Sequence, residues 1–337
     1  MKTKIYAFAL AIVALSVTSC TKDDNDPTPV ISTKVDRTDT ITLGASYVND
    51  IYYSFKNGVI AEVPRANWDI AFGVPVRSSS ILINSSAGAT LKAYPSTFTT
   101  WVSNTTLDTT GYKTWDFLYN SDTTWEDGAF SRNATGFPNY GWCIYDYSST
   151  HNLTGNAIYV IKLRNGDFKK IFIDKKLSAL QKYTFHYANI DGTDEHTVNE
   201  IDASTSKANY IYYSLQDNGI VADREPDAST WDILFTKWID NSMVYPVTGA
   251  LQNNGITAIK KTADDPSTIT YSDDQFCSKI NTIGADWKTI NMSTYQYDIP
   301  TNRYYIVKDK NNIVYRINFK SFAGSSTGVL SFYIKQL

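Results

Sequence analysis

The sequence has little charge and few of the residues that mark catalytic or metal sites. Only 19% of its 337 residues are charged, the formal net charge is −3, and the chain holds three His, three Cys and three Met. So weak a charge gives no electrostatic basis for binding nucleic acid, and three cysteines exclude a disulfide-dense mini-domain. The many aromatic residues, 24 Tyr and 8 Trp among them, exclude a disordered chain.

Short motifs of enzymes are missing as well. The sequence has no G-x-G-x-x-G, H-E-x-x-H or C-x-x-C-H, and neither Cys143 nor Cys277 belongs to a C-x-x-C pair. A G-x-S-x-G string occurs at 324–328, but no His follows it, so a hydrolase order of Ser, acid and His is impossible and we expect a turn there. We therefore expect no enzymatic activity. The spacing does not decide whether Cys143 and Cys277 form a disulfide or stay as lone thiols.

The N-terminus predicts export and a lipid anchor. A basic start is followed at 5–17 by an apolar run without charge, which is typical of a signal peptide. The string VTSC at 17–20 resembles a bacterial lipobox, which implies a signal peptide at 1–19 and acylation of Cys20; ordinary secretory cleavage is the alternative. Residues 20–32 are rich in Asp, Pro and Thr and predict a flexible tether. We expect the mature protein to contact the membrane only through its lipid.

The rest of the chain repeats itself. IYYSF at 51–55 returns as IYYSL at 211–215, and an Asn-Gly turn follows each. WDIAF at 68–72 returns as WDILF at 231–235, and YVIK at 159–162 matches YIVK at 305–308. Because several blocks keep their order, we interpret the repeat as a duplication, with one domain at 33–206 and a second at 207–337.

Local patterns predict an all-β protein, mainly antiparallel, with few short helices. Runs of aromatic and β-branched residues lie between Asn-Gly, Asp-Gly and Ser/Thr-rich turns, and no long stretch has the 3.6-residue helical period. At 183–187 the alternation places Tyr183, Phe185 and Tyr187 on one face of a strand. Asp69 and Asp232 each follow a Trp within an apolar strand, so we expect structural carboxylates bonded to a neighbouring turn.

The ordered set of blocks resembles the HmuY family of heme-binding surface lipoproteins. The hairpin YVIKLRNGDFKKIFI at 159–173, the opening VDRTDT at 35–40 and the closing GVLSFYI at 328–334 are similar as well, so the resemblance covers nearly the whole mature chain. It implies two tandem HmuY-like β-domains that take up heme and pass it to an outer-membrane, TonB-dependent receptor. The acidic segment at 22–26 also resembles the signal that places lipoproteins of Bacteroidota on the outer face of the outer membrane.

The resemblance implies that a heme-iron ligand lies a few residues after a Trp that precedes the late hairpin. Tyr147 and Met292 lie five positions after Trp142 and Trp287, His151 lies slightly further along, and Met243 is a fourth candidate. Tyr, Met and His all ligate heme iron in proteins. Each also has a simpler interpretation, a solvated His or Tyr in a polar loop or a Met that fills a gap.

Two other functions stay open. The fold could have lost heme and bind a glycan or a partner protein through exposed aromatic residues, because a fold does not dictate its function. The chain could also be a structural or adhesin-like surface protein without a small ligand. An exposed aromatic platform would favour glycan binding, and an apolar slot flanked by Met, His or Tyr would favour heme.

Overall fold

A computed structural model describes residues 34–95 and 98–337. The expected signal peptide, Cys20 and the tether lie outside these residues. The described chain is all-β and antiparallel, as the sequence predicts. Its helices are 3-10 turns of three residues each: η1 (Ala45–Tyr47), η2 (Ser85–Ala87), η3 (Tyr112–Thr114), η4 (Ala129–Ser131), η5 (Ser178–Leu180), η6 (Pro266–Thr268), η7 (Asp273–Gln275) and η8 (Gly324–Ser326).

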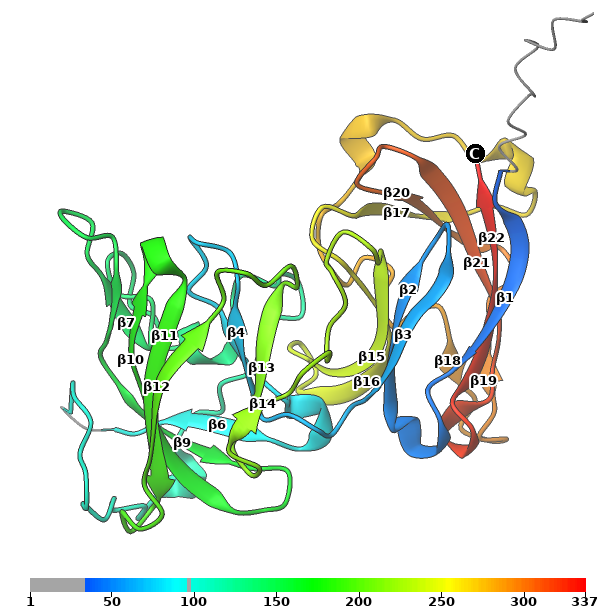
Figure 1. Ribbon diagram of the computed structural model, residues 1–337. Coiled ribbons are helices and arrows are strands. Elements are labelled where there is room, and N and C mark those ends of the chain that lie inside the picture. Colours follow the sequence, from blue (N-terminus) through cyan, green and yellow to red (C-terminus); the bar gives the residue numbers. More distant parts are fainter. Residues whose placement is uncertain (1–33, 96–97) are drawn as a thin grey trace, which may run out of the picture. The chain divides into compact units, whose positions relative to one another are not determined.

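The first group of sheets contains both ends of the described chain, and we call residues 34–65 and 229–337 the split module. Two of its sheets have the strand orders β1-β22-β21-β20-β17 and β3-β2-β15-β16, and a short hairpin, β18-β19, accompanies them (Figure 1). The strands are β1 (Asp36–Thr42), β2 (Asn49–Ser54), β3 (Gly58–Pro64), β15 (Ile233–Asp240), β16 (Tyr245–Gln252), β17 (Thr257–Thr262), β18 (Thr289–Ile290), β19 (Tyr297–Asp298), β20 (Arg303–Lys308), β21 (Val314–Phe322) and β22 (Val329–Gln336).

Residues 66–228 form the second group, which we call the inserted module. One sheet has the order β14-β13-β4-β5, and the other contains the order β12-β11-β10-β9-β6, with β8 also paired to β10 and β7 paired to β8. The strands are β4 (Ile70–Gly73), β5 (Ile81–Ile83), β6 (Thr90–Ala93), β7 (Cys143–Tyr145), β8 (Leu153–Gly155), β9 (Ile158–Lys162), β10 (Phe168–Leu177), β11 (Lys182–Asn189), β12 (His196–Asp202), β13 (Tyr210–Ser214) and β14 (Gly219–Ile220).

The two modules share one strand arrangement but follow it in a different chain order. β12 lies beside β11 as β1 lies beside β22, and the β13-β14 hairpin lies against β4 as the β2-β3 hairpin lies against β15. In the split module the chain runs through β1, β2 and β3 before β15. In the inserted module it begins at β4 and reaches the equivalent three strands last. The inserted module is therefore a circular permutation of the split module.

This arrangement exchanges hairpins between the two sequence copies. Tyr53 of β2 is the register partner of Ile233 of β15, and Tyr213 of β13 is the partner of Ile70 of β4. Each IYYS hairpin thus pairs with the Trp-Asp strand of the other copy. The expected domain boundary at 206/207 falls between β12 and β13, within the inserted module. The division into domains at 33–206 and 207–337 stays a prediction about the repeat, while the sheets divide the chain differently.

The two Trp-Asp carboxylates fasten the exchanged hairpins, which confirms their expected structural role. Asp69 accepts hydrogen bonds from the backbone N–H of Leu215, at 2.8 Å, and from Nε2 of Gln216, at 3.0 Å. Asp232 accepts one from the backbone N–H of Phe55, at 2.7 Å. The turn that donates to each carboxylate is close to it in space but belongs to the other copy of the repeat. Each carboxylate therefore joins two segments that are far apart in the sequence.

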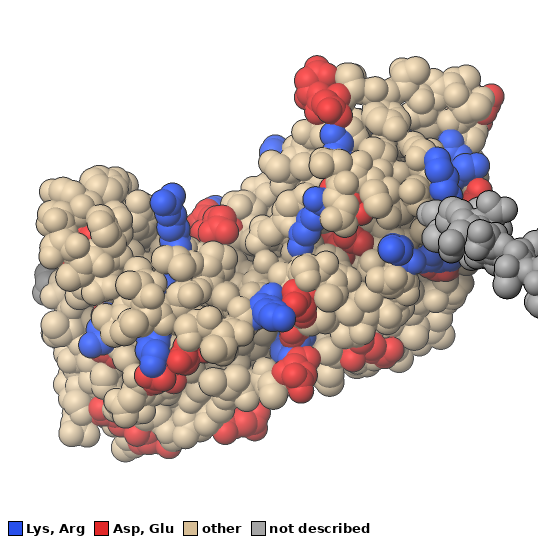
Figure 2. All heavy atoms as spheres, turned by 45° about the horizontal axis from the view of Figure 1, so that its top comes forward, with Lys and Arg blue, Asp and Glu red and all other residues tan. Residues whose placement is uncertain are grey.

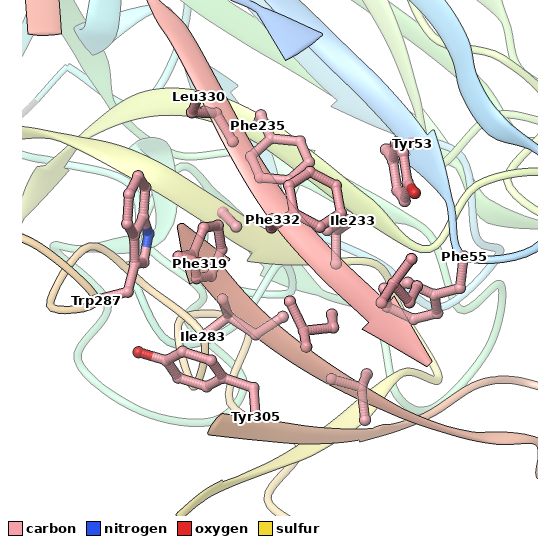
Figure 3. Packing of buried hydrophobic residues seen from close by; sticks show 14 of the residues in the cluster. Tyr53, Phe55, Ile233, Phe235, Ile283, Trp287, Tyr305, Phe319, Leu330 and Phe332 are labelled. Atoms are coloured by element: carbon pink, nitrogen blue, oxygen red, sulfur yellow. The ribbon is translucent and has the colours of Figure 1, made fainter. Parts of the chain in front are cut away.

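Each module has a hydrophobic core of its own. In the split module Phe332 of β22 packs against Tyr53 and Phe235 of the opposite sheet, with ring centroids 5.2 and 5.4 Å apart (Figure 3). Trp287 stacks on Phe319 at 4.1 Å. In the inserted module the predicted alternation at 183–187 is confirmed, because Tyr183, Phe185 and Tyr187 are fully buried in its largest cluster. These two clusters share no residue.

Both cysteines in the described residues are free. Cys143 is fully buried in the core of the inserted module, and Cys277 is partly buried beside β17 of the split module.

On the face drawn in Figure 2, acidic and basic side chains are scattered across a mostly uncharged surface. The G-x-S-x-G string contains η8, which connects β21 to β22, so it is the expected turn.

Candidate functional site

Tyr147 and Met292 occupy equivalent places in the two modules. Tyr147 lies at the tip of the β7-β8 hairpin and Met292 at the tip of the β18-β19 hairpin. Each tip is shaped by its first side chain: Asp146 accepts from the backbone N–H groups that follow it, and Asn291 does the same. The two candidate ligands are 60% and 69% exposed. The preceding tryptophans, from which both were predicted, are buried core residues.

His151 lies on the same tip as Tyr147 and is already engaged. Its Nδ1 shares a 2.8 Å hydrogen bond with the hydroxyl of Tyr145, and the ring is exposed. The other two histidines are engaged as well. Nδ1 of His186 lies 2.7 Å from a carboxylate oxygen of Asp174, and its ring stacks on Trp101. The ring of His196 stacks on Tyr187. No contact among the described residues places two histidines on one site.

Met243 is the candidate ligand that lies beside a cavity. It is 61% exposed at the tip of the β15-β16 hairpin, and its neighbours Asn241 and Val244 line an open groove of about 820 Å³. That volume is within the range of small-molecule pockets. The groove is lined by Ala93, Pro95, Thr114, Trp115, Asp116, Phe117, Leu118, Tyr119, Arg132, Asn133, Asn241 and Val244.

The aromatic wall of the groove comes from an irregular loop that follows β6. Phe117 and Tyr119 stack with ring centroids 5.8 Å apart, and Trp115 packs edge-on against Tyr94 and Tyr112. Phe117 is 47% exposed. Rings held by their neighbours in this way offer flat apolar surface to a ligand without losing much side-chain freedom on binding.

A buried lysine fixes this loop. Lys92 of β6 is fully buried, and its ammonium donates to the backbone carbonyls of Tyr112, at 2.9 Å, and Trp115, at 2.6 Å. The same ammonium lies 3.8 Å from the centroid of the Phe117 ring, a cation–π contact. Burial lowers the pKa of Lys92, since the charged form loses its hydration. The carbonyls and the ring replace part of that hydration, which makes Lys92 a positioning residue for the groove.

The opposite side of the groove is anchored by one asparagine. Asn241 and Asp122 exchange two hydrogen bonds of 3.1 Å, each backbone N–H donating to the other residue's side chain. Nδ2 of Asn241 also donates to the carbonyl of Asn120. These bonds hold the Met243 hairpin, from the split module, against the aromatic loop of the inserted module.

The groove combines apolar faces with a polar rim. Asp116, Asn133 and Arg132 supply the polar groups, and Arg132 forms an ion pair with Asp127. In the described residues no group of three or more His, Cys, Asp or Glu could hold a metal ion. The hydroxyl of Tyr119, which lines the groove, and the thioether of Met243 beside it are groups that could coordinate iron. The arrangement is suited to binding a flat or ring-shaped molecule.

Sequence reasoning missed the aromatic loop and Lys92. The signal that could have found the loop is the alternation of Trp115, Phe117 and Tyr119 in a stretch rich in turn residues. Nothing in the sequence indicated that Lys92 would be buried beneath it.

As helices, the described residues contain only 3-10 turns of three residues, and none of these is long and apolar enough to span a membrane.

Comparisons with known proteins give only distant similarities. No family model and no curated protein matches the chain. Among solved structures, it is similar to an apo HmuY analog from Tannerella forsythia, with 15% identity, a TM-score of 0.22, and 45% of this chain and 88% of that one covered. Apo PinO from Porphyromonas gingivitis has 14% identity and a TM-score of 0.21, covering 52% and 88%. A putative lipoprotein from Bacteroides fragilis has 12% identity and a TM-score of 0.20, covering 50% and 88%. TM-scores this low carry no argument about function.

Proposed function

We propose that this chain is a non-catalytic surface lipoprotein that binds heme in the groove beside Met243. The observation that carries the proposal is an open groove of about 820 Å³ with a wall of stacked aromatic rings and a methionine hairpin on its other side. The sequence blocks that resemble the HmuY family support the choice of heme. Acylated Cys20 would anchor the protein to the outer membrane, and a TonB-dependent receptor would accept the ligand.

The groove residues fit heme in part. Phe117 and Tyr119 would pack against the porphyrin, the thioether of Met243 would hold the iron, and Arg132 would supply a cation for the carboxylates of the porphyrin. Ligation by two histidines does not fit, because all three histidines are engaged away from the groove. Tyr147, His151 and Met292 stay predicted ligands, since no described contact connects them with the groove.

A hemin titration of the purified, unlipidated protein tests the proposal. We expect a saturable shift of the Soret band in the wild type and a changed spectrum in Met243→Leu, because leucine keeps the volume and removes the sulfur. Met292→Leu is the matched control, since Met292 is also exposed on a hairpin tip. Tyr147→Phe and His151→Ala complete the assignment. A wild-type spectrum identical to free hemin would reject heme binding, and a change confined to Met292→Leu would move the site to the other hairpin.

The polar rim favours a second candidate, a glycan in the same groove. Asp116, Asn133 and Asn241 can exchange hydrogen bonds with sugar hydroxyls, and Phe117 can lie against a sugar ring. If hemin gives no shift, binding to a glycan array that is lost in Phe117→Ala would support this candidate. If Phe117→Ala binds hemin and glycans as well as the wild type does, both proposed uses of the groove are contradicted.

A further inference from the structure

A second cavity, separate from the groove, lies where residues of both modules meet. Its volume is about 80 Å³, and it shares no lining residue with the groove. Asp50, Tyr52 and Thr236 line it from the split module, and Trp68 and Arg224 line it from the inserted module. Since a water molecule takes up roughly 30 Å³ of liquid, the space is large enough for a small ligand of a few heavy atoms.

At one end of this cavity a single carboxylate, Asp50, faces two guanidinium groups, while the other charged lining residues, Asp122 and Lys237, are of opposite sign. The carboxylate of Asp50 accepts hydrogen bonds from Nε of Arg65, at 2.8 Å, and from the hydroxyl of Thr236, at 2.6 Å, and it also forms an ion pair with Arg224. Asp50, Arg65 and Arg224 are 3%, 4% and 3% exposed. Two buried guanidinium groups therefore share one carboxylate, an arrangement that is costly without a further anion.

Glu225 does not supply the missing acceptor. Its carboxylate accepts from the backbone and side-chain nitrogens of Asn209 and from the hydroxyl of Tyr212, and it forms no hydrogen bond with Arg224. Burial raises the pKa of Glu225, which disfavours its charged form. Glu225 thus leaves Nε of Arg224 without an acceptor.

Two buried donors in the lining residues lack acceptors. Nε of Arg224 and the indole Nε1 of Trp68 have no hydrogen-bond partner among the described residues, although both atoms are buried. An unsatisfied buried donor destabilises the folded state, more so when it carries charge. Both deficits are of the same kind, since each is a donor that needs an acceptor.

We propose that this cavity binds a small organic carboxylate. Its oxygens would accept from Arg224 and Trp68 and balance the second guanidinium, and its short apolar part would lie against the rings of Tyr212 and Trp125, which also line the space. Propionate has the charge and size that these walls require. The site is distinct from the groove, with which it shares no lining residue.

The repeat supplies a matched control for the test. Trp231 is the counterpart of Trp68: it packs edge-on against Tyr52 at 4.9 Å, as Trp68 packs against Tyr212 at 5.0 Å. The indole nitrogen of Trp231 is likewise buried without a partner, but Trp231 does not line this cavity. Trp68→Phe and Trp231→Phe therefore make the same chemical change at two equivalent places, only one of which is in the site.

The experiment titrates propionate into the purified protein at constant ionic strength and follows tryptophan fluorescence, with uncharged propionamide in parallel. We expect a saturable change with propionate alone, weakened roughly tenfold or more in Trp68→Phe and kept within about twofold in Trp231→Phe. Trp125 and Trp238 remain as reporters in the cavity. The absence of a saturable change, an equal response to propionamide, or equal weakening in the two variants would overturn the proposal and leave water as the partner of the two donors.

Discussion

At the scale of single residues, the two Trp-Asp carboxylates show how burial turns a common side chain into a structural link. Asp69 is fully buried and accepts from two residues of the turn beyond β13. Asp232 accepts from Phe55, beyond β2. A carboxylate that satisfies backbone donors fixes the end of a hairpin, but it loses hydration by doing so.

Asp232 should make the stability of the protein depend on pH. Burial raises its pKa from the ordinary 3.8 to about 6. Between these values the folded state holds a proton that the unfolded state has released, so this group's contribution to stability increases as the pH falls from 7 to 4. We expect the free energy of unfolding in urea of the wild type, minus that of Asp232→Asn, to rise by about 1–3 kcal/mol as the pH falls from 7 to 4. A difference that does not change with pH would contradict this.

At the scale of elements, buried lysines fasten the irregular loops of the inserted module. Lys92, Lys170 and Lys176 are fully buried, and each ammonium donates to two loop carbonyls. Each also lies over an aromatic ring, of Phe117, Trp101 or Tyr183. The loops have few regular backbone pairs of their own, so their shape depends on these side chains. The groove wall is one of the loops fixed in this way.

Lys92→Met should loosen the groove wall without unfolding the module. The methionine keeps the apolar stem but removes both hydrogen bonds to the carbonyls of Tyr112 and Trp115. We expect amide exchange in 112–119 to accelerate roughly tenfold or more, together with weaker binding of the groove ligand. Lys170→Met is the control, because Lys170 bonds the carbonyls of Val102 and Thr105 instead. Equal acceleration of both loops in both variants would mean a general loss of stability.

At the scale of the whole molecule, the modules and the sequence copies divide the chain differently. The largest cluster of the inserted module, with Ile70 and Leu215 among its members, lies wholly within 66–228. The largest cluster of the split module lies wholly outside that segment. Because a continuous segment contains all strands of two facing sheets and their core, it has what independent folding requires.

A fragment of residues 66–228 should therefore fold alone, whereas one of residues 33–206 should not. The second fragment lacks β13 and β14, which leaves β4 unpaired on one side, and it carries β1 without β22 and the β2-β3 hairpin without β15. We expect dispersed amide NMR signals and protease resistance from 66–228, and aggregation or disorder from 33–206. The reverse result would show that the sequence copy, and not the module, is the folding unit.

Much of the fold could be predicted locally, and the candidate site could not. The Asn-Gly turns and the alternation at 183–187 gave hairpins and a buried face because turn chemistry and the two-residue period are local properties. Met243 was named with three other candidates, and only the tertiary structure distinguishes it, by placing its neighbours Asn241 and Val244 on the groove. A wall built from a loop and a distant hairpin leaves no spacing for sequence reasoning to find.

The sequence by itself determined the all-β class, the hairpins and the structural role of Asp69 and Asp232, because each depends on side chains a few residues apart or on burial that the pattern predicts. Only the tertiary structure decided which hairpin each Trp-Asp strand pairs with, and hence that one module is inserted in the other. The strings at 51–55 and 211–215 present nearly the same edge and the same inward side chains. Nothing local distinguishes them, so the choice of partner belongs to the packing of the whole chain.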